Sequence, residues 1–150
     1  MEHSFNKSLP LVIGSDHAGY AYKERIKVVL TELGWQFIDE GTHSIESTDY
    51  PDYAHAVAAK VANGSAAAGI LICGSGNGVC MTANKHQEIR AALCWNKGLA
   101  ELARQHNNAN VLCMPERFVA FETAVEMVTS FLTTDFEGGR HEKRAAKIAL

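Results

Sequence analysis

The stretch Ile70–Val79 constrains the fold more than any other part of this chain, because an apolar run reaches Cys73 and then meets three glycines in five residues. An apolar run without alternating polar residues is typical of a buried strand in a parallel sheet. The glycines allow a sharp turn that points bare backbone N–H groups in one direction. Such a loop at the start of a helix favours binding an anion or stabilising an oxyanion, here with a thiol at its mouth.

Apolar runs alternate with helix-like segments along the whole chain, and this alternation predicts a parallel α/β fold. The expected strands are Leu9–Gly14, Trp35–Asp39, Ile70–Cys73, Arg90–Cys94 and Asn110–Met114. The expected helices are Tyr20–Leu33, Pro51–Ala62, Gly78–Asn84, Lys97–His106, Pro115–Leu132 and a final basic helix over Gly139–Leu150. We expect one domain over residues 1–150, a three-layer α/β/α sandwich with a Rossmann-like, five-stranded parallel sheet.

Charge and hydropathy narrow the class of partner. The net charge of −3 provides no general basic field, which argues against nucleic acid as a partner. The first ten residues are polar, and no apolar run approaches the roughly 20 residues that cross a bilayer. We therefore expect a cytoplasmic protein that binds neither nucleic acid nor membrane.

The four cysteines contain no Cys-x-x-Cys pair, which argues against a structural zinc site although seven histidines are present. Cys80, Cys94 and Cys113 are expected to be small core residues of a protein in a reducing compartment. Cys73 differs because it ends a strand, where open α/β sheets place their ligands.

Polar and titratable side chains follow the other strands as well. They are Asp16, His17, His43, Trp95 and Asn96, with His106 and Asn107 in the loop after the next helix. We expect these residues to gather with Cys73 at one edge of the sheet. Each has a structural alternative: Asp16 serves equally well as a helix cap, His17 as a solvated residue, and His106–Asn108 as a helix C-cap.

The glycine loop matches neither common nucleotide-binding motif. Its glycines are misplaced for G-x-G-x-x-G, and it lacks the Lys-Ser/Thr of a P-loop. Near the C-terminus, Arg140 and Arg144 share one face of the final helix. They form either a solvated basic surface or a guanidinium clamp for phosphate.

Six motifs in order resemble one known family. They are Ser15–Gly19, Thr48–Ala54, Cys73–Gly78, Ala83–Lys85, Arg104–Asn110 and Gly139–His141. Together they resemble the B-type ribose-5-phosphate isomerases, a family that also contains galactose-6-phosphate isomerase subunits. The resemblance extends over nearly the whole chain, from about Leu9 to Ile148.

The resemblance implies an aldose–ketose isomerase, without metal or cofactor, that interconverts ribose 5-phosphate and ribulose 5-phosphate through a cis-enediolate. It implies that Cys73 is the base, that His106 opens the sugar ring, and that Ser75 and Asp16 shuttle protons at the sugar oxygens. Substrate binding is implied for Asp16, His17, Tyr50, Gly74, Ser75, Gly76, Asn77, Gly78, Asn107, Arg117, Arg140 and Arg144. The family also implies a homodimer, or a dimer of dimers, with the final helix reaching the partner subunit.

Three alternatives stay open from the sequence. The substrate is a six-carbon sugar phosphate, allose or galactose 6-phosphate, if the pocket near His43, Trp95 and Asn96 is deep enough. A non-catalytic domain that binds phosphometabolites would keep the glycine loop without needing the thiol. A thiol redox or acyl-transfer enzyme using Cys73 and His106 is disfavoured because no resolving Cys-x-x-Cys is present.

Overall fold

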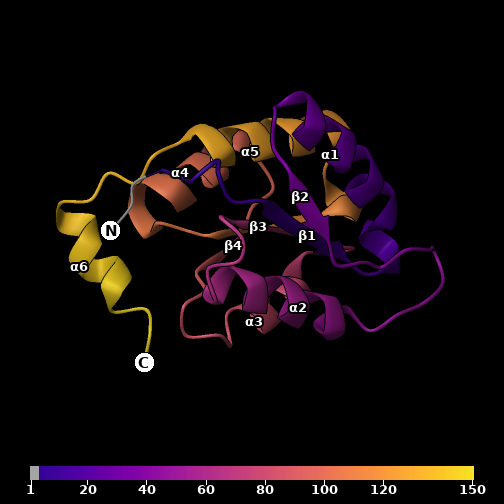
Figure 1. Cartoon of the computed structure of the whole chain (residues 1–150), viewed down its shortest axis with the longest axis horizontal. Coiled ribbons are helices and arrows are strands. Elements are labelled where there is room, and N and C mark those ends of the chain that lie inside the picture. The colour runs from indigo at the N-terminus through magenta and orange to yellow at the C-terminus, as the bar shows by residue number, and fades with distance from the viewer. Residues whose placement is uncertain (1–3) are drawn as a thin grey trace.

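A five-stranded parallel sheet lies between two layers of helices in the computed structural model, which describes residues 4–150 (Figure 1). The strands are β1 (Leu11–Ser15), β2 (Phe37–Asp39), β3 (Gly69–Cys73), β4 (Ala91–Leu93) and β5 (Val111–Pro115). They lie in the order β2-β1-β3-β5-β4, and every neighbouring pair is parallel. The predicted Rossmann-like α/β fold is thereby confirmed.

The helices are α1 (Tyr20–Glu32), α2 (Tyr50–Ala62), α3 (Asn77–Ala83), α4 (Lys97–Asn107), α5 (Phe121–Thr133) and α6 (Arg140–Ala146), with short 3-10 helices η1 (His17–Gly19) and η2 (Glu116–Phe118). Helices α1, α4 and α5 cover one face of the sheet, and α2 and α3 cover the other (Figure 1). Ile70 and Ile72 of β3 belong to the first core, whereas Leu71 and Cys73 belong to the second. Because both faces are covered, the central strands are apolar throughout.

The predicted long helix over Pro115–Leu132 is wrong. The chain continues as β5 to Pro115, turns through η2, and becomes extended at Val119 before α5 begins at Phe121. A contact with a distant segment stabilises the extended residue between η2 and α5: Tyr22 Oη donates a hydrogen bond to the Val119 carbonyl at 2.7 Å. The break leaves η2 at the carboxyl edge of the sheet.

The other boundaries differ less. The second strand is shorter than predicted and begins at Phe37, and the final helix ends at Ala146. Beyond that helix, the Leu150 N–H donates a hydrogen bond to Gln87 Oε1 at 2.8 Å, and this contact holds the C-terminal residue against the loop after α3. Among residues 4–150 no helix is both long enough and apolar enough to cross a membrane.

A buried network of charges joins α1 to the end of β2. Lys23 is fully buried, and its Nζ donates to both carboxylate oxygens of Asp39, at 2.9 and 2.7 Å. Burial alone would raise the pKa of Asp39, but hydrogen bonds from Lys23, Lys27 and the Gly41 N–H outweigh it and lower the pKa to about 2. The Gly41 carbonyl then accepts the Ser15 N–H, so the network supports the end of β1.

Candidate active site

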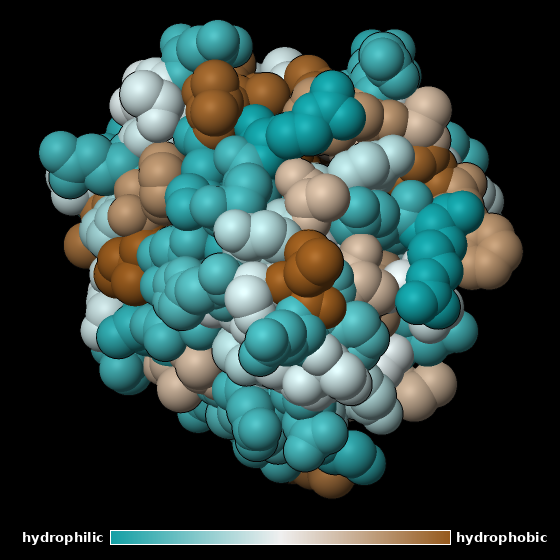
Figure 2. Space-filling model, turned by 90° about the vertical axis from the view of Figure 1, so that its right-hand side faces the viewer, coloured by the Kyte–Doolittle hydropathy of each residue, from teal (hydrophilic) through white to brown (hydrophobic). Residues whose placement is uncertain are grey.

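A cavity of about 620 Å³ opens at the carboxyl edge of the sheet. It is lined by Asp16, His17, Ala18, Tyr50, Cys73, Gly74, Ser75, Asn77, Gly78, Met81, Arg117 and Phe118. Nine of the sequence-predicted site residues are therefore brought together, as expected for a ligand site in an open α/β fold. Hydrophilic residues dominate this edge of the molecule, and hydrophobic ones are scattered over it (Figure 2).

Cys73 ends β3 and keeps only 5% of its surface exposed, at the wall of the cavity. The Gly76 N–H donates to its Sγ at 3.1 Å, so the glycine loop curls over the sulfur. Gly76 has φ 74°, and a Cβ there would collide with Leu93 Cδ1 and lie 3.1 Å from the Met114 carbonyl carbon. Only glycine fits this turn without strain, and the turn is what aims a backbone amide at the thiol.

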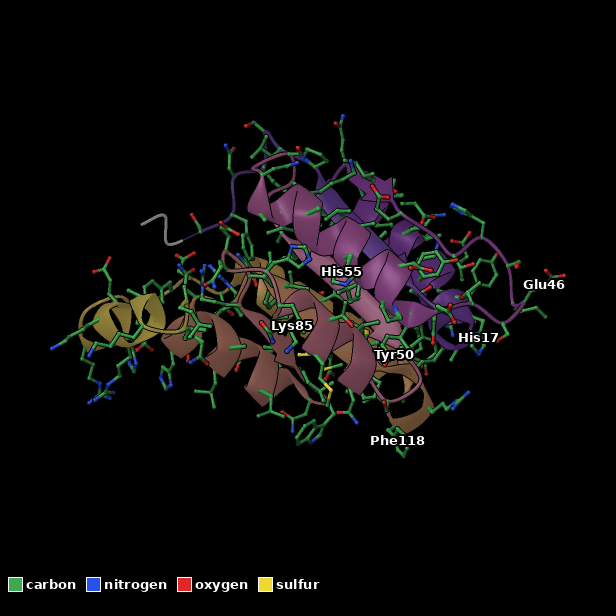
Figure 3. The ribbon with its side chains drawn as sticks, turned by 90° about the horizontal axis from the view of Figure 1, so that it is seen from below. His17, Glu46, Tyr50, His55, Lys85 and Phe118 are labelled. Atoms are coloured by element: carbon green, nitrogen blue, oxygen red, sulfur yellow. The ribbon has the colours of Figure 1, made fainter. Side chains whose placement is uncertain are left out.

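Asp16 is buried and its Oδ1 accepts hydrogen bonds from the Ala18 and Gly19 N–H groups, at 3.0 and 3.1 Å. The two readings of this residue are thus compatible, because one carboxylate caps η1 and also faces the cavity. His17 accepts the Thr48 N–H at Nδ1, at 3.2 Å, which leaves Nε2 to carry the proton of the neutral ring. His17 and Tyr50 lie near each other at one end of the molecule (Figure 3).

Arg117 comes from η2 and supplies a cation at the loop. The backbone N–H of Arg117 donates a hydrogen bond to the Gly74 carbonyl at 3.1 Å. A Cβ added to Gly74 would lie 3.1 Å from the carbon of the Arg117 guanidinium group. The absence of a side chain at Gly74 therefore admits the guanidinium. Across the loop, a Cβ at Gly78 would lie 2.5 Å from the Tyr50 ring, so Tyr50 closes the other wall.

Glu116 was not among the predicted site residues, but it precedes Arg117 in η2 and interacts electrostatically with Asp16 of the cavity wall. Its Oε2 is buried without a hydrogen-bond partner. Burial and the neighbouring charge of Asp16 raise the pKa of Glu116 above its usual value. The sequence placed Glu116 in a helix over Pro115–Leu132, whereas the 3-10 turn η2 buries its Oε2.

The remaining predicted residues lie elsewhere in the chain, which corrects the expectation of a single edge. His106, Asn107, Arg140 and Arg144 do not line the cavity, and α6 lies at the opposite end of the molecule from His17 and Tyr50 (Figure 3). The reason is topological. In a parallel sheet, loops from strand to helix lie at the carboxyl edge, whereas His106 ends a helix that leads into the next strand.

His43, Trp95 and Asn96 also lie outside the cavity lining, and Asn96 caps α4 by accepting the Leu99 N–H at 2.9 Å. The other cysteines behave as predicted for core residues. Cys94 and Cys113 are buried, Cys80 is half-buried, and burial raises the pKa of Cys94 to about 12.

The cavity thus combines a thiol, a hydrogen-bonded carboxylate and a guanidinium around a loop of backbone amides. A thiol beside a carboxylate can move protons, and amides can stabilise an oxyanion. Within one chain, however, the histidine and two of the arginines expected at such a site are at the other edge.

Comparisons of the sequence with known proteins point to one family. The sequence profile of a family described as Ribose/Galactose Isomerase matches residues 11–148. Ribose-5-phosphate isomerase B of Escherichia coli strain K12 is 46% identical over 138 residues, which span 92% of this chain and 93% of that protein.

Solved structures give the same result for the fold. The chain superposes on ribose-5-phosphate isomerase B from Clostridium thermocellum with a TM-score of 0.92 and 45% identity, over 93% of this chain and 95% of that one. It superposes on the Mycoplasma genitalium enzyme with bound ribulose-5-phosphate with a TM-score of 0.91 and 45% identity, over 95% of each chain.

Proposed function

The chain belongs to the ribose/galactose isomerase family, and from that premise we propose that it interconverts D-ribose 5-phosphate and D-ribulose 5-phosphate with Cys73 as the base. The observation that carries the assignment of the base is the Gly76 N–H bonded to Cys73 Sγ at the wall of the cavity. The bound ribulose-5-phosphate of the Mycoplasma genitalium relative supports the choice of substrate.

In the proposed reaction, the sulfur of Cys73 removes the C2 proton of the open-chain aldose. The electron pair forms the C1–C2 double bond, and negative charge moves to O1. Asp16 and Ser75 then transfer the O2 proton to O1, and Cys73 returns its proton to C1, which leaves the ketone at C2. A carbon acid of this kind yields to a weak base only when the enediolate oxygen is stabilised as it forms.

The backbone N–H groups of the glycine loop have different partners, and only some of them are left to bind the enediolate oxygen. The Gly76 N–H is committed to the sulfur, and the Asn77 N–H donates to Ser75 Oγ at 3.3 Å. We therefore assign the enediolate oxygen to the amides of Ser75 and Gly78 rather than to the whole loop. Gly78 lies in the first turn of α3, where amides have no partner within the helix.

Four of the expected site residues lie at the edge opposite the cavity, and we therefore propose that two copies of the chain share each active site in a homodimer. These residues are His106, Asn107, Arg140 and Arg144. His106 of one copy then opens the furanose ring bound by the other, and Asn107 holds the sugar. Arg140 and Arg144 from α6 join His17 and Arg117 on the phosphate. Guanidinium pairs bind phosphate oxygens in a forked geometry that suits this role.

The base is tested by Cys73→Ala, with Cys80→Ala as the matched control, since Cys80 is half-buried in α3 and does not line the cavity. We expect kcat for ribose 5-phosphate to fall by about 10²–10⁴-fold in Cys73→Ala. The control should retain its rate, and both variants should show the circular dichroism of the parent. Near-normal turnover in Cys73→Ala contradicts the proposal.

The shared site is tested by mixing subunits. Under the proposal Cys73→Ala and His106→Gln should each be nearly inactive, but their heterodimer should hold one site with both groups intact. Unfolding and refolding an equal mixture should recover about a quarter of the parent activity, because half of the dimers are mixed and each carries one working site. No recovery, with dimers verified by light scattering, places His106 and Cys73 in the same subunit's site.

A further inference from the structure

Two histidines and a carboxylate meet at the end of the molecule opposite the cavity. The rings of His106 and His141 stack with centroids 4.2 Å apart and planes 8° apart. Glu137 Oε2 lies 3.9 Å from His106 Nε2 and 3.5 Å from His141 Nε2. The three ligand atoms lie within 4.8 Å of one another.

The backbone builds this cluster from two segments. The Glu137 N–H donates to the Gln105 carbonyl at 3.1 Å, which ties the loop before α6 to the last turn of α4 beside His106. Gly138 and Gly139 follow with φ values of 66° and 55°, and this left-handed turn lets α6 begin at once. His141 is then folded back onto His106, with its N–H donating to the Gly138 carbonyl at 3.0 Å.

The distances from Glu137 Oε2 to the two histidine nitrogens bring the three side chains together without a hydrogen bond between them. Both nitrogen–oxygen distances exceed the roughly 3.2 Å limit of an N–H···O hydrogen bond. In a tetrahedral zinc site with bonds of about 2.0–2.1 Å, ligand atoms lie about 3.3 Å apart. A cation therefore needs to draw the more distant atoms inward and to rotate the stacked imidazole rings until their in-plane lone pairs meet at one point. The exposed fraction of the side chain is 41% at His106 and 52% at Glu137, which leaves freedom to adjust.

The donor set also fits a transition metal. Two imidazoles and one carboxylate bind zinc-like cations, with a fourth position left to water. Metal binding requires a free lone pair on each imidazole, so protons compete with the metal for both rings. The positive charges of Arg140 and Arg144 lie near His141 and oppose the binding of a divalent ion, whereas the carboxylate of Glu137 favours it.

We propose that His106, Glu137 and His141 form a binding site for a zinc-class divalent transition metal, and that metal bound there inhibits isomerisation. The inhibition rests on the proposed function, because the metal takes the Nε2 lone pair of His106 and holds the ring on its own subunit. The His106 imidazole then cannot protonate the ring oxygen of a sugar bound by a second copy. Metal here is an inhibitor and has no part in the reaction.

Binding is measured first, without substrate, on the full-length chain stripped with a chelator. Zn²⁺ affinity is determined by competition with a chromophoric chelator for the parent, Glu137→Gln and His55→Gln. Removing a ligand should weaken Zn²⁺ binding by about 10–100-fold or more in Glu137→Gln. His55→Gln is the matched control, because His55 forms a separate histidine pair, with His86 at 2.9 Å, and should leave the affinity unchanged.

Co²⁺ reports the kind of ligand. Cobalt at this site should give d–d absorption without a sulfur-to-metal charge-transfer band, and the spectrum should persist in Cys73→Ala. Unchanged zinc affinity in Glu137→Gln, or a sulfur band that disappears in Cys73→Ala, overturns the site and moves the metal to the catalytic cavity.

Inhibition is measured next, as the Zn²⁺ concentration that halves each variant's own metal-free rate. That concentration should rise by the same factor as the dissociation constant in Glu137→Gln and stay unchanged in His55→Gln. Binding at the cluster without inhibition overturns the regulatory part of the proposal. The proposed function fails separately, if the metal-free parent does not isomerise ribose 5-phosphate. The ring-opening role of His106 fails if metal-free His106→Gln keeps the parent rate.

Discussion

Replacing Asp39 by asparagine should destabilise the protein in a manner that depends on pH. The substitution keeps the shape of the side chain but removes the charge that faces the fully buried Lys23. Asp39 has a depressed pKa in the folded protein, about 2 against an ordinary 3.8. Its stabilising contribution is therefore complete above the unfolded pKa and is lost as the pH falls through the folded one.

The magnitude follows from that difference in pKa. At 1.36 kcal/mol per pKa unit, the depression amounts to about 2.5 kcal/mol of stability at pH 7, which falls to about half by pH 3. The side chain is only 15% exposed, so solvent screening removes little of it. The substitution also leaves Lys23 with Glu24 as its remaining carboxylate, a cost that does not vary with the charge of residue 39.

Urea unfolding of parent and variant at pH 7, 5, 4 and 3 measures the gap in the free energy of unfolding. We expect the gap to be largest at pH 7 and to shrink by about 1 kcal/mol at pH 3. Glu40→Gln is the control, because Glu40 pairs at 3.5 Å with the half-exposed Lys60 and should contribute less than about 1 kcal/mol. A gap that is equal at pH 7 and pH 3 refutes the reasoning about Asp39.

Three further outcomes are expected. Glu116→Gln should be more stable than the parent at pH 7 in urea unfolding and lose that advantage near pH 4, because the raised folded pKa of Glu116 makes ionisation above that range destabilising; a constant difference contradicts this. Gly76→Ala should lose about 2–4 kcal/mol in the same assay, from a positive φ and the contact with Leu93, and an unchanged midpoint argues against the strain. Arg140→Ala combined with Arg144→Ala should lower kcat/KM for ribose 5-phosphate by about 100-fold, mainly through KM, whereas an unchanged KM returns α6 to a solvated surface.

The turn of the glycine loop beside Cys73 was predictable because it is local. Cys73 and the glycines after it are contiguous, so an apolar run, a thiol and a turn specify one another over a short stretch of chain. The parallel five-stranded sheet needed no specific contact either, since alternating strand and helix segments favour parallel pairing. The family resemblance implied that His17, Tyr50 and Arg117 belong to the same site as the thiol, and all three line the cavity with Cys73.

The failures came from contacts between distant segments. The helix predicted from Pro115 is interrupted by two hydrogen bonds to distant parts of the chain. The Arg117 backbone N–H donates to the Gly74 carbonyl, and Tyr22 Oη donates to the Val119 carbonyl. Lys23 fits a solvated position in a helical pattern, and only the placement of Asp39 explains its burial. The position of His106 was a different kind of error, because it did not depend on long-range contacts. Loops at the two edges of a parallel sheet alternate along the chain, so counting the strands and helices would have shown the edge at which His106 lies.

The placement of the two half-sites at opposite edges has a consequence for how the rate depends on the amount of protein. A subunit that carries Cys73 at one end and His106 at the other is folded but catalytically incomplete. Under the proposed function, activity should fall in proportion to concentration only while subunits remain associated. Below that range it should fall with the square of concentration, since every turnover then waits for two chains to meet.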